Sequence, residues 1–280
     1  MQPVTAPGRL SHRAAWVLRW LVGPLVQLCF RPTLDGTEHL PADRPYLLVA
    51  NHSAGVGAAE LASIATLWFK RFGTTRPLAG FALPLGFVVW PVSAVHRALG
   101  TIPSTYPSAH DALAKGVPLL VFPGGDHESL KPVWHNHGVD FAGRVGFLRI
   151  AREAGVPIVP LGIRNGALTA PILLRSRFLP NFLILPRLLG LKRWGLSLLG
   201  VSVAALLAIT LPFGALPTAL LIWIWLSSPF VFLPIFPATL RLRIGPPLTS
   251  EALFPSNAGE EELAEARDRV ERAIEALVRG

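Results

Sequence analysis

Residues 46–60 read "YLLVANHSAGVGAAE", and this stretch decides the fold. Its apolar run predicts a buried strand that ends at Asn51 and His52, because strands buried on both faces are continuously hydrophobic. Small residues, including Gly55 and Gly57, separate this histidine from Glu60. Functional groups in open α/β sheets gather at the carboxyl ends of strands. His52 is therefore a candidate functional residue.

The chain on either side of this stretch alternates between helix-like and strand-like segments. Residues 60–72 and 141–155 have helical patterns, and the segments "VPLLVFPGG", "VPIVPLGI" and "TLRLRIGPPL" resemble strands. The pattern predicts an α/β fold: a layered mixed or mostly parallel sheet with flanking helices. We expect its core in residues 32–193, and its final strand and C-terminal amphipathic helix in residues 241–280.

Residues 1–31 are expected to form an N-terminal membrane-interface segment. The stretch "HRAAWVLRWLVGPLVQLCF" is basic and then apolar, but Arg19 interrupts it and no small-residue cleavage site follows. It is short for a helix that crosses a bilayer. Trp16 and Trp20 favour a helix lying in the interface. An ordinary core helix is the alternative.

Residues 194–240 contain no charged residue and no histidine. Two apolar arms flank "PFGALP", which predicts a turn, so we expect a hydrophobic membrane hairpin inserted in the core. Lys192 and Arg193 precede it and Arg241 and Arg243 follow it, which places both ends on one side of a membrane. The positive-inside bias predicts the cytoplasmic face. Each arm is about long enough to cross or deeply enter the bilayer, and a buried helical pair of a soluble protein is the alternative.

The overall composition favours a membrane surface over nucleic acid as the partner. Hydrophobic residues make up 51% of the 280 residues and charged residues only 15%, while the net charge is +9. The basic residues lie beside apolar segments, which is typical of proteins that meet an anionic bilayer. We therefore expect membrane lipids as partners and no nucleic acid. Cys29 is the only cysteine, which excludes an intramolecular disulfide and a zinc site made of cysteines.

Four short blocks give the chain a family resemblance. The "NH" after the first strand is followed in order by "LGTIPS", "VFPGGDHES" and "GVPIVPLGI". Their order and spacing resemble the glycerolipid acyltransferases, which include the lysophosphatidic acid enzymes. The resemblance covers residues 34–166 and resumes at 239–253. The Pro-Gly-Gly form of the third block is more similar to the diacylglycerol-acyltransferase-like branch.

The resemblance implies transfer of a fatty acyl group from a thioester to a lipid hydroxyl. His52 would be the general base, and its side chain titrates in the range that this role needs. Backbone N–H groups near Gly124 and Gly125 would stabilise the oxyanion. Acyl-CoA or acyl carrier protein would be the co-substrate, with no resident cofactor. The predicted substrate-binding residues are Asn51, Ser53, Thr101, Pro103, Phe122, Pro123, Gly124, Gly125, Asp126, Glu128, Lys131 and Arg144.

The chain departs from the family pattern at three positions. The family places an aspartate five residues after the histidine, where this chain has Gly57, and Glu60 is our candidate for a substitute. Glu60 can reach His52 only if residues 55–57 form a loop and the helix begins near Ala58; Asp126 and Glu128 are rival partners. The second block lacks the phosphate-binding arginine, and Gly125 stands in place of the glutamate of the third block. The acyl acceptor is therefore not restricted to a phosphate-bearing lipid, and a neutral alcohol or a large lipid is an alternative. Lys131 or Arg144 could supply positive charge in place of the missing arginine.

Two hypotheses from other functional classes remain. The "HNH" at residues 135–137, near Asp126, His127 and Glu128, resembles part of a metal site or nuclease, but this pattern is weak by itself and we predict no metal. The missing aspartate also permits a catalytically silent, lipid-binding membrane protein on an acyltransferase-like fold.

Overall fold

The computed structural model describes residues 6–188, 190–255 and 259–280. The first five residues of the expected N-terminal segment, and residues 256–258 of the expected last segment, lie outside the described residues. The strands are β1 Thr33–Asp35, β2 Leu47–Ala50, β3 Ala79–Ala82, β4 Ile102–Pro103, β5 Leu119–Val121, β6 Ile158–Arg164, β7 Ile172–Ser176, β8 Trp194–Ser197 and β9 Arg241–Ile244. The helices are α1 His12–Val17, α2 Gly23–Phe30, α3 Ala58–Phe72, α4 Val92–Leu99, α5 Tyr106–Ala114, α6 Gly125–Ser129, α7 Gly146–Ala154, α8 Leu179–Leu183, α9 Leu185–Leu188, α10 Leu198–Thr210, α11 Ala215–Ser227, α12 Ser250–Leu253 and α13 Glu260–Arg279.

Seven strands form one mixed sheet in the order β1-β9-β6-β2-β5-β3-β4. All neighbouring pairs in it are parallel except β6 and β9, which are antiparallel. The segment "TLRLRIGPPL" returns as β9 and inserts between β1 and β6. The predicted α/β class, with a mostly parallel sheet and flanking helices, is confirmed.

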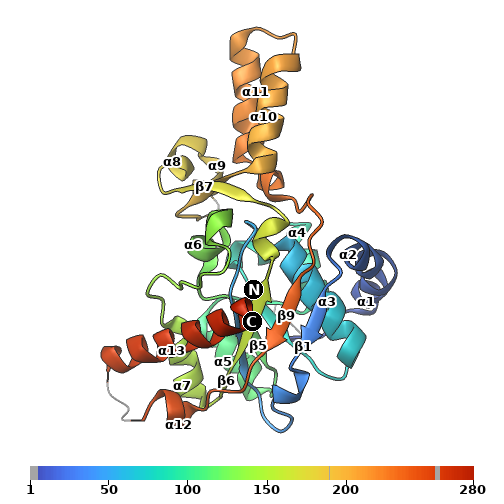
Figure 1. The fold of residues 1–280 in the computed structure, drawn as a ribbon. Coiled ribbons are helices and arrows are strands. Elements are labelled where there is room, and N and C mark those ends of the chain that lie inside the picture. The colour runs from blue at the N-terminus through green and yellow to red at the C-terminus, as the bar shows by residue number, and fades with distance from the viewer. Residues whose placement is uncertain (1–5, 189, 256–258) are drawn as a thin grey trace.

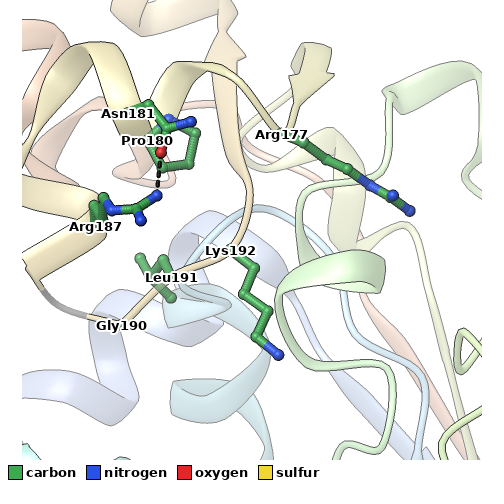
Figure 2. Close-up of a pocket in the computed structure, with 7 residues that line it drawn as sticks. All are labelled: Arg177, Pro180, Asn181, Arg187, Gly190, Leu191 and Lys192. Atoms are coloured by element: carbon green, nitrogen blue, oxygen red, sulfur yellow. Dashed lines mark hydrogen bonds between the residues drawn. The ribbon is translucent and has the colours of Figure 1, made fainter.

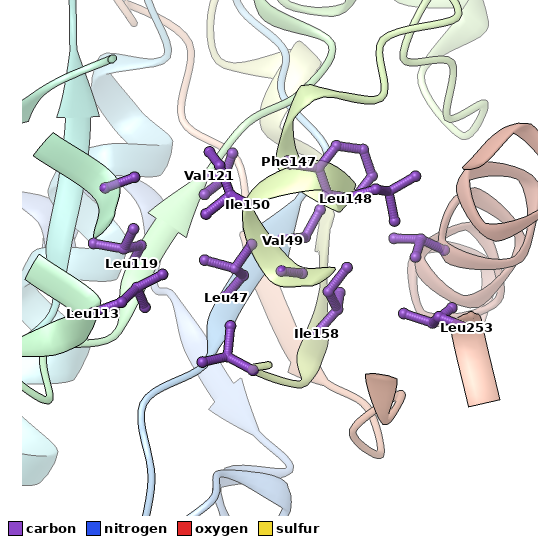
Figure 3. Close-up of a cluster of buried hydrophobic side chains, with 14 of the residues drawn as sticks. Leu47, Val49, Leu113, Leu119, Val121, Phe147, Leu148, Ile150, Ile158 and Leu253 are labelled. Atoms are coloured by element: carbon purple, nitrogen blue, oxygen red, sulfur yellow. The ribbon is translucent and has the colours of Figure 1, made fainter. Parts of the chain in front are cut away.

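The side chains of the central strand β2 pack into the hydrophobic cores on both faces of the sheet. Leu47 and Val49 enter a core with α5, α7 and α13 (Figure 3), whereas Leu48 and Ala50 enter a second core with α2 and α3. Successive side chains of a strand point to opposite faces, so one apolar run serves both cores. This central position brings His52, two residues past the strand, to the carboxyl edge of the sheet.

The N-terminal segment packs on α3 through one side. Val26 and Phe30 of α2 are buried in the second core, and a π-helical turn, Leu18–Val22, joins α1 to α2. On its other side Trp16 and Trp20 are 62% and 60% exposed. The outer side of this segment is therefore apolar as well, with its tryptophans exposed.

An inserted lobe, residues 172–236, carries the hydrophobic hairpin. The strands β7 and β8 pair as a separate antiparallel sheet, and α10 and α11 project from it as a hairpin (Figure 1). A third core forms at the foot of this hairpin, where Trp194 and Phe232 pack with Leu183 and Ile172. The expected boundary at residue 194 is therefore wrong, because residues 172–188 pack with the hairpin and residues 194–197 are strand.

The arms of the hairpin are shorter than the sequence indicated. Each helix has 13 residues, or about 20 Å at 1.5 Å per residue. Within the residues that the structure describes, no helix combines the length and the apolar character that crossing a membrane needs. Of the two arrangements left open for these arms, crossing the bilayer is therefore not supported.

Candidate active site

The site begins where β2 ends beside β6. Asn51 is buried, its amide nitrogen donates to the Ile163 carbonyl at 2.8 Å, and its amide oxygen accepts from the Ile163 N–H at 2.7 Å. Both polar groups of Asn51 are thus used to join two strands. The structure gives this predicted substrate-binding residue a structural contact that holds the backbone at His52.

The ring of His52 pairs with Glu60. The Nδ1 atom lies 2.7 Å from Glu60 Oε2, and the Glu60 side chain is fully buried. Residues 54–56 form a turn and α3 begins at Ala58, which is the arrangement that this pair required. Because the Glu60 carboxylate accepts a hydrogen bond from Nδ1–H, the His52 ring is held as the tautomer that is protonated at Nδ1. Its Nε2 is then a free hydrogen-bond acceptor.

Ser53 completes the setting of the carboxylate. Its N–H donates to Glu60 Oε2 at 3.1 Å, and its hydroxyl donates to Glu60 Oε1. Three donors therefore surround one buried carboxylate, which compensates the cost of burying its charge. Ser53 is itself buried, so its observed contact orients Glu60.

Two glycines make room for this pair. A Cβ atom on Gly57 would overlap the His52 ring and stand 2.8 Å from Nδ1. A Cβ atom on Gly166 would overlap Glu60 Oε1 and stand 2.6 Å from Ser53 Oγ. The position of the family aspartate is thus occupied by the histidine ring itself, and the acid comes from the first turn of α3. Sequence reasoning missed Gly166, whose only signal was its place three residues after the end of the fourth block.

The third block forms a turn at the carboxyl end of β5. The Gly125 N–H donates to the Phe122 carbonyl at 3.2 Å, so that amide is already used in the turn. The Gly124 N–H makes no hydrogen bond to any described residue. Of the two expected oxyanion donors, Gly124 has the free N–H. The Phe122 ring packs against His52 with a distance of 4.6 Å between the ring centroids. The side chain of Pro123 is apolar.

Glu128 fills the space beside Gly124, whereas Arg144 stands beside Gly125, the position of the missing glutamate. A Cβ atom on Gly124 would lie 2.6 Å from Glu128 Oε2. That oxygen accepts the backbone N–H of His52 at 3.1 Å, and Oε1 lies 3.5 Å from Lys131 Nζ. Burial raises the pKa of Glu128 to about 7, although Lys131 and His52 oppose the shift. As a rival partner, Glu128 contacts the backbone of His52 rather than its ring.

The predicted sources of positive charge are engaged with the protein. Lys131 is buried and donates to the Gly138 carbonyl at 2.6 Å. Arg144 donates to the carbonyls of Pro123 and Gly124, and its Nη2 lies 2.7 Å from Asp126 Oδ1. Asp126 also pairs with Arg193 at 3.4 Å, so it is not a partner of the His52 ring. These residues brace the third block.

Thr101 and Pro103 lie apart from this cluster. Thr101 directly precedes β4, and Pro103 lies in that strand. β4 is at the edge of the sheet, and β3 and β5 separate it from β2. The Thr101 hydroxyl donates to the His96 carbonyl at 3.2 Å. Their predicted role in substrate binding stays a prediction.

The histidines of the "HNH" pattern do not form a metal cluster. Among the described residues, no group of three or more histidine, cysteine and acidic side chains is arranged to hold a metal ion. His127 Nε2 instead lies 2.7 Å from Asp140 Oδ2, and burial lowers the pKa of His127.

Comparisons with known proteins agree with the geometry. Residues 31–164 match the family model described as acyltransferase. This segment is an acyltransferase domain. The match begins just before β1 and ends with β6, so it contains the whole His52 and Glu60 arrangement. The resemblance seen in the four blocks is thereby confirmed.

The similar proteins show how far this assignment extends. Uncharacterised proteins of Mycobacterium tuberculosis and Mycobacterium bovis are each 27% identical over 175 residues, or 62% of this chain and 49% of theirs. The chain thus matches about half the length of these relatives. The crystal structure of the 1-acyl-sn-glycerophosphate acyltransferase PlsC from Thermotoga maritima aligns with a TM-score of 0.51 and 19% identity. That alignment covers 95% of this chain and 81% of PlsC, and it shows a shared fold.

Proposed function

We propose that this acyltransferase transfers a fatty acyl group from a thioester to the hydroxyl of a lipid, at a membrane surface, with His52 as general base. The observation that carries the proposal is the 2.7 Å contact between His52 Nδ1 and Glu60. It supplies the carboxylate that the family pattern places at position 57 and that this chain lacks there. The free Nε2 is then available for a substrate hydroxyl.

In the proposed reaction, the lipid hydroxyl oxygen attacks the thioester carbonyl carbon while Nε2 takes the hydroxyl proton. The buried carboxylate of Glu60 stabilises the imidazolium that results. The free N–H of Gly124 is the proposed donor to the oxyanion. Collapse of the tetrahedral intermediate breaks the carbon–sulfur bond, and the imidazolium returns its proton to the departing thiolate. The products are an ester and a thiol, and no covalent enzyme intermediate is needed.

The membrane location is supported by two exposed apolar surfaces. The hairpin presents side chains such as Ile209 and Leu216, which are 83% and 72% exposed. The N-terminal helix adds Trp16 and Trp20 on its outer side. Exposed apolar surface of this extent is typical of proteins that contact a membrane or a partner. We propose attachment from the cytoplasmic face, by insertion of the hairpin into one leaflet rather than by crossing.

The test is acyl transfer by the purified chain in detergent or liposomes. Labelled acyl-CoA is supplied with lysophosphatidic acid, other lysophospholipids, diacylglycerol or long-chain alcohols, and acyl carrier protein thioester is the second donor. We expect His52→Ala to lower turnover by about 10²-fold or more, since general bases contribute 10²–10⁴-fold. His110→Ala is the matched control, because His110 is exposed and pairs with Glu153 instead.

Full turnover in His52→Ala would remove this residue from the mechanism. Absence of product with every acceptor and both donors, in a folded protein that binds lipid, would instead favour the silent lipid-binding alternative.

A further inference from the structure

The inserted lobe is unusually one-sided in charge. From residue 154 to residue 250 the chain contains no aspartate and no glutamate. The basic residues of that stretch are Arg164, Arg175, Arg177, Arg187, Lys192, Arg193, Arg241 and Arg243. Arg175 lies in β7, and four more of them lie between β7 and β8, at the foot of the hairpin. The lobe therefore carries positive charge that its own sequence does not neutralise.

Three of these cations line one hollow. It has a volume of about 380 Å³ and is formed by Arg177, Arg187 and Lys192 together with Pro180, Asn181, Gly190 and Leu191. Figure 2 shows Arg187 bonded to Asn181, while the side chains of Arg177 and Lys192 extend without a bond to the other residues drawn. Within the described part of the chain, none of the three cations forms an ion pair. The hollow thus has three cations and no anion.

The neighbouring arginines add to this field. Arg193 pairs with Asp126, and Arg175 donates to the His127 carbonyl. Burial lowers the pKa of Arg175, and the nearby guanidinium groups of Arg193 and Arg177 lower it further. An anion in the hollow would relieve this repulsion. Guanidinium groups bind phosphate oxygens through paired, charge-assisted hydrogen bonds.

The surroundings of the hollow indicate where such an anion would come from. Phe178 and Phe182 line a second hollow, which shares Asn181 with the first, and they are 82% and 76% exposed. The helix α8 is fixed to the hairpin, because Trp223 Nε1 donates to the Phe182 carbonyl and Ser227 Oγ to the Leu183 carbonyl, both at 3.1 Å. The hollow therefore lies at the foot of an apolar projection and beside exposed aromatic rings.

The length of the hairpin is similar to the thickness of one leaflet. A hairpin of 13-residue helices is about 20 Å long, whereas one leaflet contributes about 15 Å of hydrocarbon. When the apolar tip is immersed in one leaflet, the foot of the hairpin lies near the level of the lipid phosphates. Basic residues placed there attract anionic headgroups.

We propose that the hollow lined by Arg177, Arg187 and Lys192 binds the phosphate of an anionic lipid in the leaflet that the hairpin enters. This inference rests on the membrane location in the proposed function and names the headgroup chemistry that it uses. The hollow is distinct from the candidate active site, because none of its lining residues is among those that contact His52 or Glu60.

The experiment measures binding of the full chain to vesicles of phosphatidylcholine, with and without phosphatidylglycerol. The test variant is Arg177→Gln/Arg187→Gln/Lys192→Gln. The control variant, Lys115→Gln/Arg269→Gln/Arg272→Gln, removes the same number and kind of charges from exposed positions on α13 and at the end of α5. A thermal melt establishes that both variants fold, and Arg177→Lys is the milder substitute if the triple variant does not.

We expect the test variant to lose about tenfold to a hundredfold of its affinity for the anionic vesicles. The control variant should lose less than about threefold, because its charges are remote from the foot of the hairpin. Equal losses in both triple variants, or no loss in the test variant, would overturn the proposal. A rise in the KM for acyl-CoA with unchanged vesicle binding would also overturn it, because the hollow would then serve the donor.

This outcome is independent of the proposed reaction. Turnover by the parent chain in detergent reports on the reaction, whereas the difference between the two triple variants reports on the hollow. Vesicle binding that depends on the three cations in a chain without turnover would uphold the inference and reject the reaction.

Discussion

The ring of His52 occupies the space that a side chain at position 57 would need. The acid that pairs with it stands in the first turn of α3, at Glu60, and Gly166 leaves room for the carboxylate. The proposed acid thus stands three residues further along the chain than the aspartate of the family pattern. Substitutions at Glu60 and at Gly57 test the carboxylate and the space for the His52 ring separately.

Glu60→Gln should lower kcat by about 10²-fold or more, because a neutral amide neither fixes the tautomer of His52 nor stabilises its imidazolium. Steady-state kinetics across pH measures this, and KM for the lipid should change little. Ser53→Ala is the comparison: it removes a hydrogen bond to the same carboxylate but leaves the contact with the ring. Wild-type kcat in Glu60→Gln would exclude Glu60 as the positioning residue.

Gly57→Ala should abolish most of the turnover, by about 10²-fold or more, because the new Cβ overlaps the His52 ring. Gly155→Ala is a closely matched control. Gly57 has φ 62° and ψ 26°, Gly155 has φ 62° and ψ 27°, and no atom lies within 4 Å of a Cβ placed on Gly155. Both variants should lose about 1–2 kcal/mol of unfolding free energy from backbone strain. Similar turnover in the two would show that the ring does not need this space.

At the scale of elements, the hairpin of α10 and α11 is the part of the fold that the main sheet does not explain. Its foot is anchored by a third core that includes Trp194 and Phe232, whereas its tip contacts little of the protein. An apolar projection of this kind has no stabilising role in the sheet, which is why we connect it to lipid. It can therefore be altered without loss of the core.

Ile209→Ser/Phe213→Ser/Leu216→Ser should weaken binding to phosphatidylcholine vesicles by about 10²-fold or more, because each buried apolar side chain contributes about 1.5–3 kcal/mol. Vesicle flotation measures this, and the melting temperature in detergent-free buffer should not fall. Ile209→Leu/Leu216→Ile, which keeps the apolar surface, should bind as the parent does. Unchanged flotation of the serine variant would exclude the hairpin tip as the membrane contact.

At the scale of the whole molecule, buried charges connect the site to its surroundings. Asp126 pairs with Arg144 of the core and with Arg193 of the inserted lobe, and Glu128 pairs with Lys131 beneath the backbone of His52. The buried pair of Glu128 and Lys131 brings a desolvation cost that the mutual attraction of the two charges only partly offsets. That cost belongs to the folding equilibrium of the entire chain.

The raised pKa of Glu128 predicts how stability depends on pH. Its pKa is about 7 in the folded chain and near 4.5 when unfolded, so the folded state binds the proton more tightly. The contribution of this proton to stability is complete below pH 4.5 and is lost as pH rises through 7, with a total of about 3 kcal/mol. Denaturant unfolding at pH values from 4.5 to 8 measures the slope.

Glu128→Gln should flatten that slope relative to the parent chain. Glu128→Gln/Lys131→Met should flatten it too, without leaving the buried lysine unpaired. Glu265→Gln is the control, because Glu265 is exposed on α13. A slope in Glu128→Gln equal to that of the parent would contradict the assignment of the titration to this residue.

The sequence by itself determined the α/β class, the position of His52 at the end of a buried strand and the family resemblance. These features depend on local patterns: an apolar run of strand length, a polar pair after it, and blocks in a set order. Glu60 was one of three candidate acids, because the choice depended on where α3 begins and on the space left by Gly57 and Gly166.

The tertiary structure decided which partner each charged residue takes. Lys131 and Arg144, expected to be available to a ligand, are engaged by Glu128, Asp126 and backbone carbonyls. The three cations of the hollow come together only because α8 and residues 190–192 pack beside the hairpin, and the 13-residue arms end where β8 and the third core begin. Such partnerships depend on the packing of segments far apart in the chain, which hydrophobic periodicity does not encode.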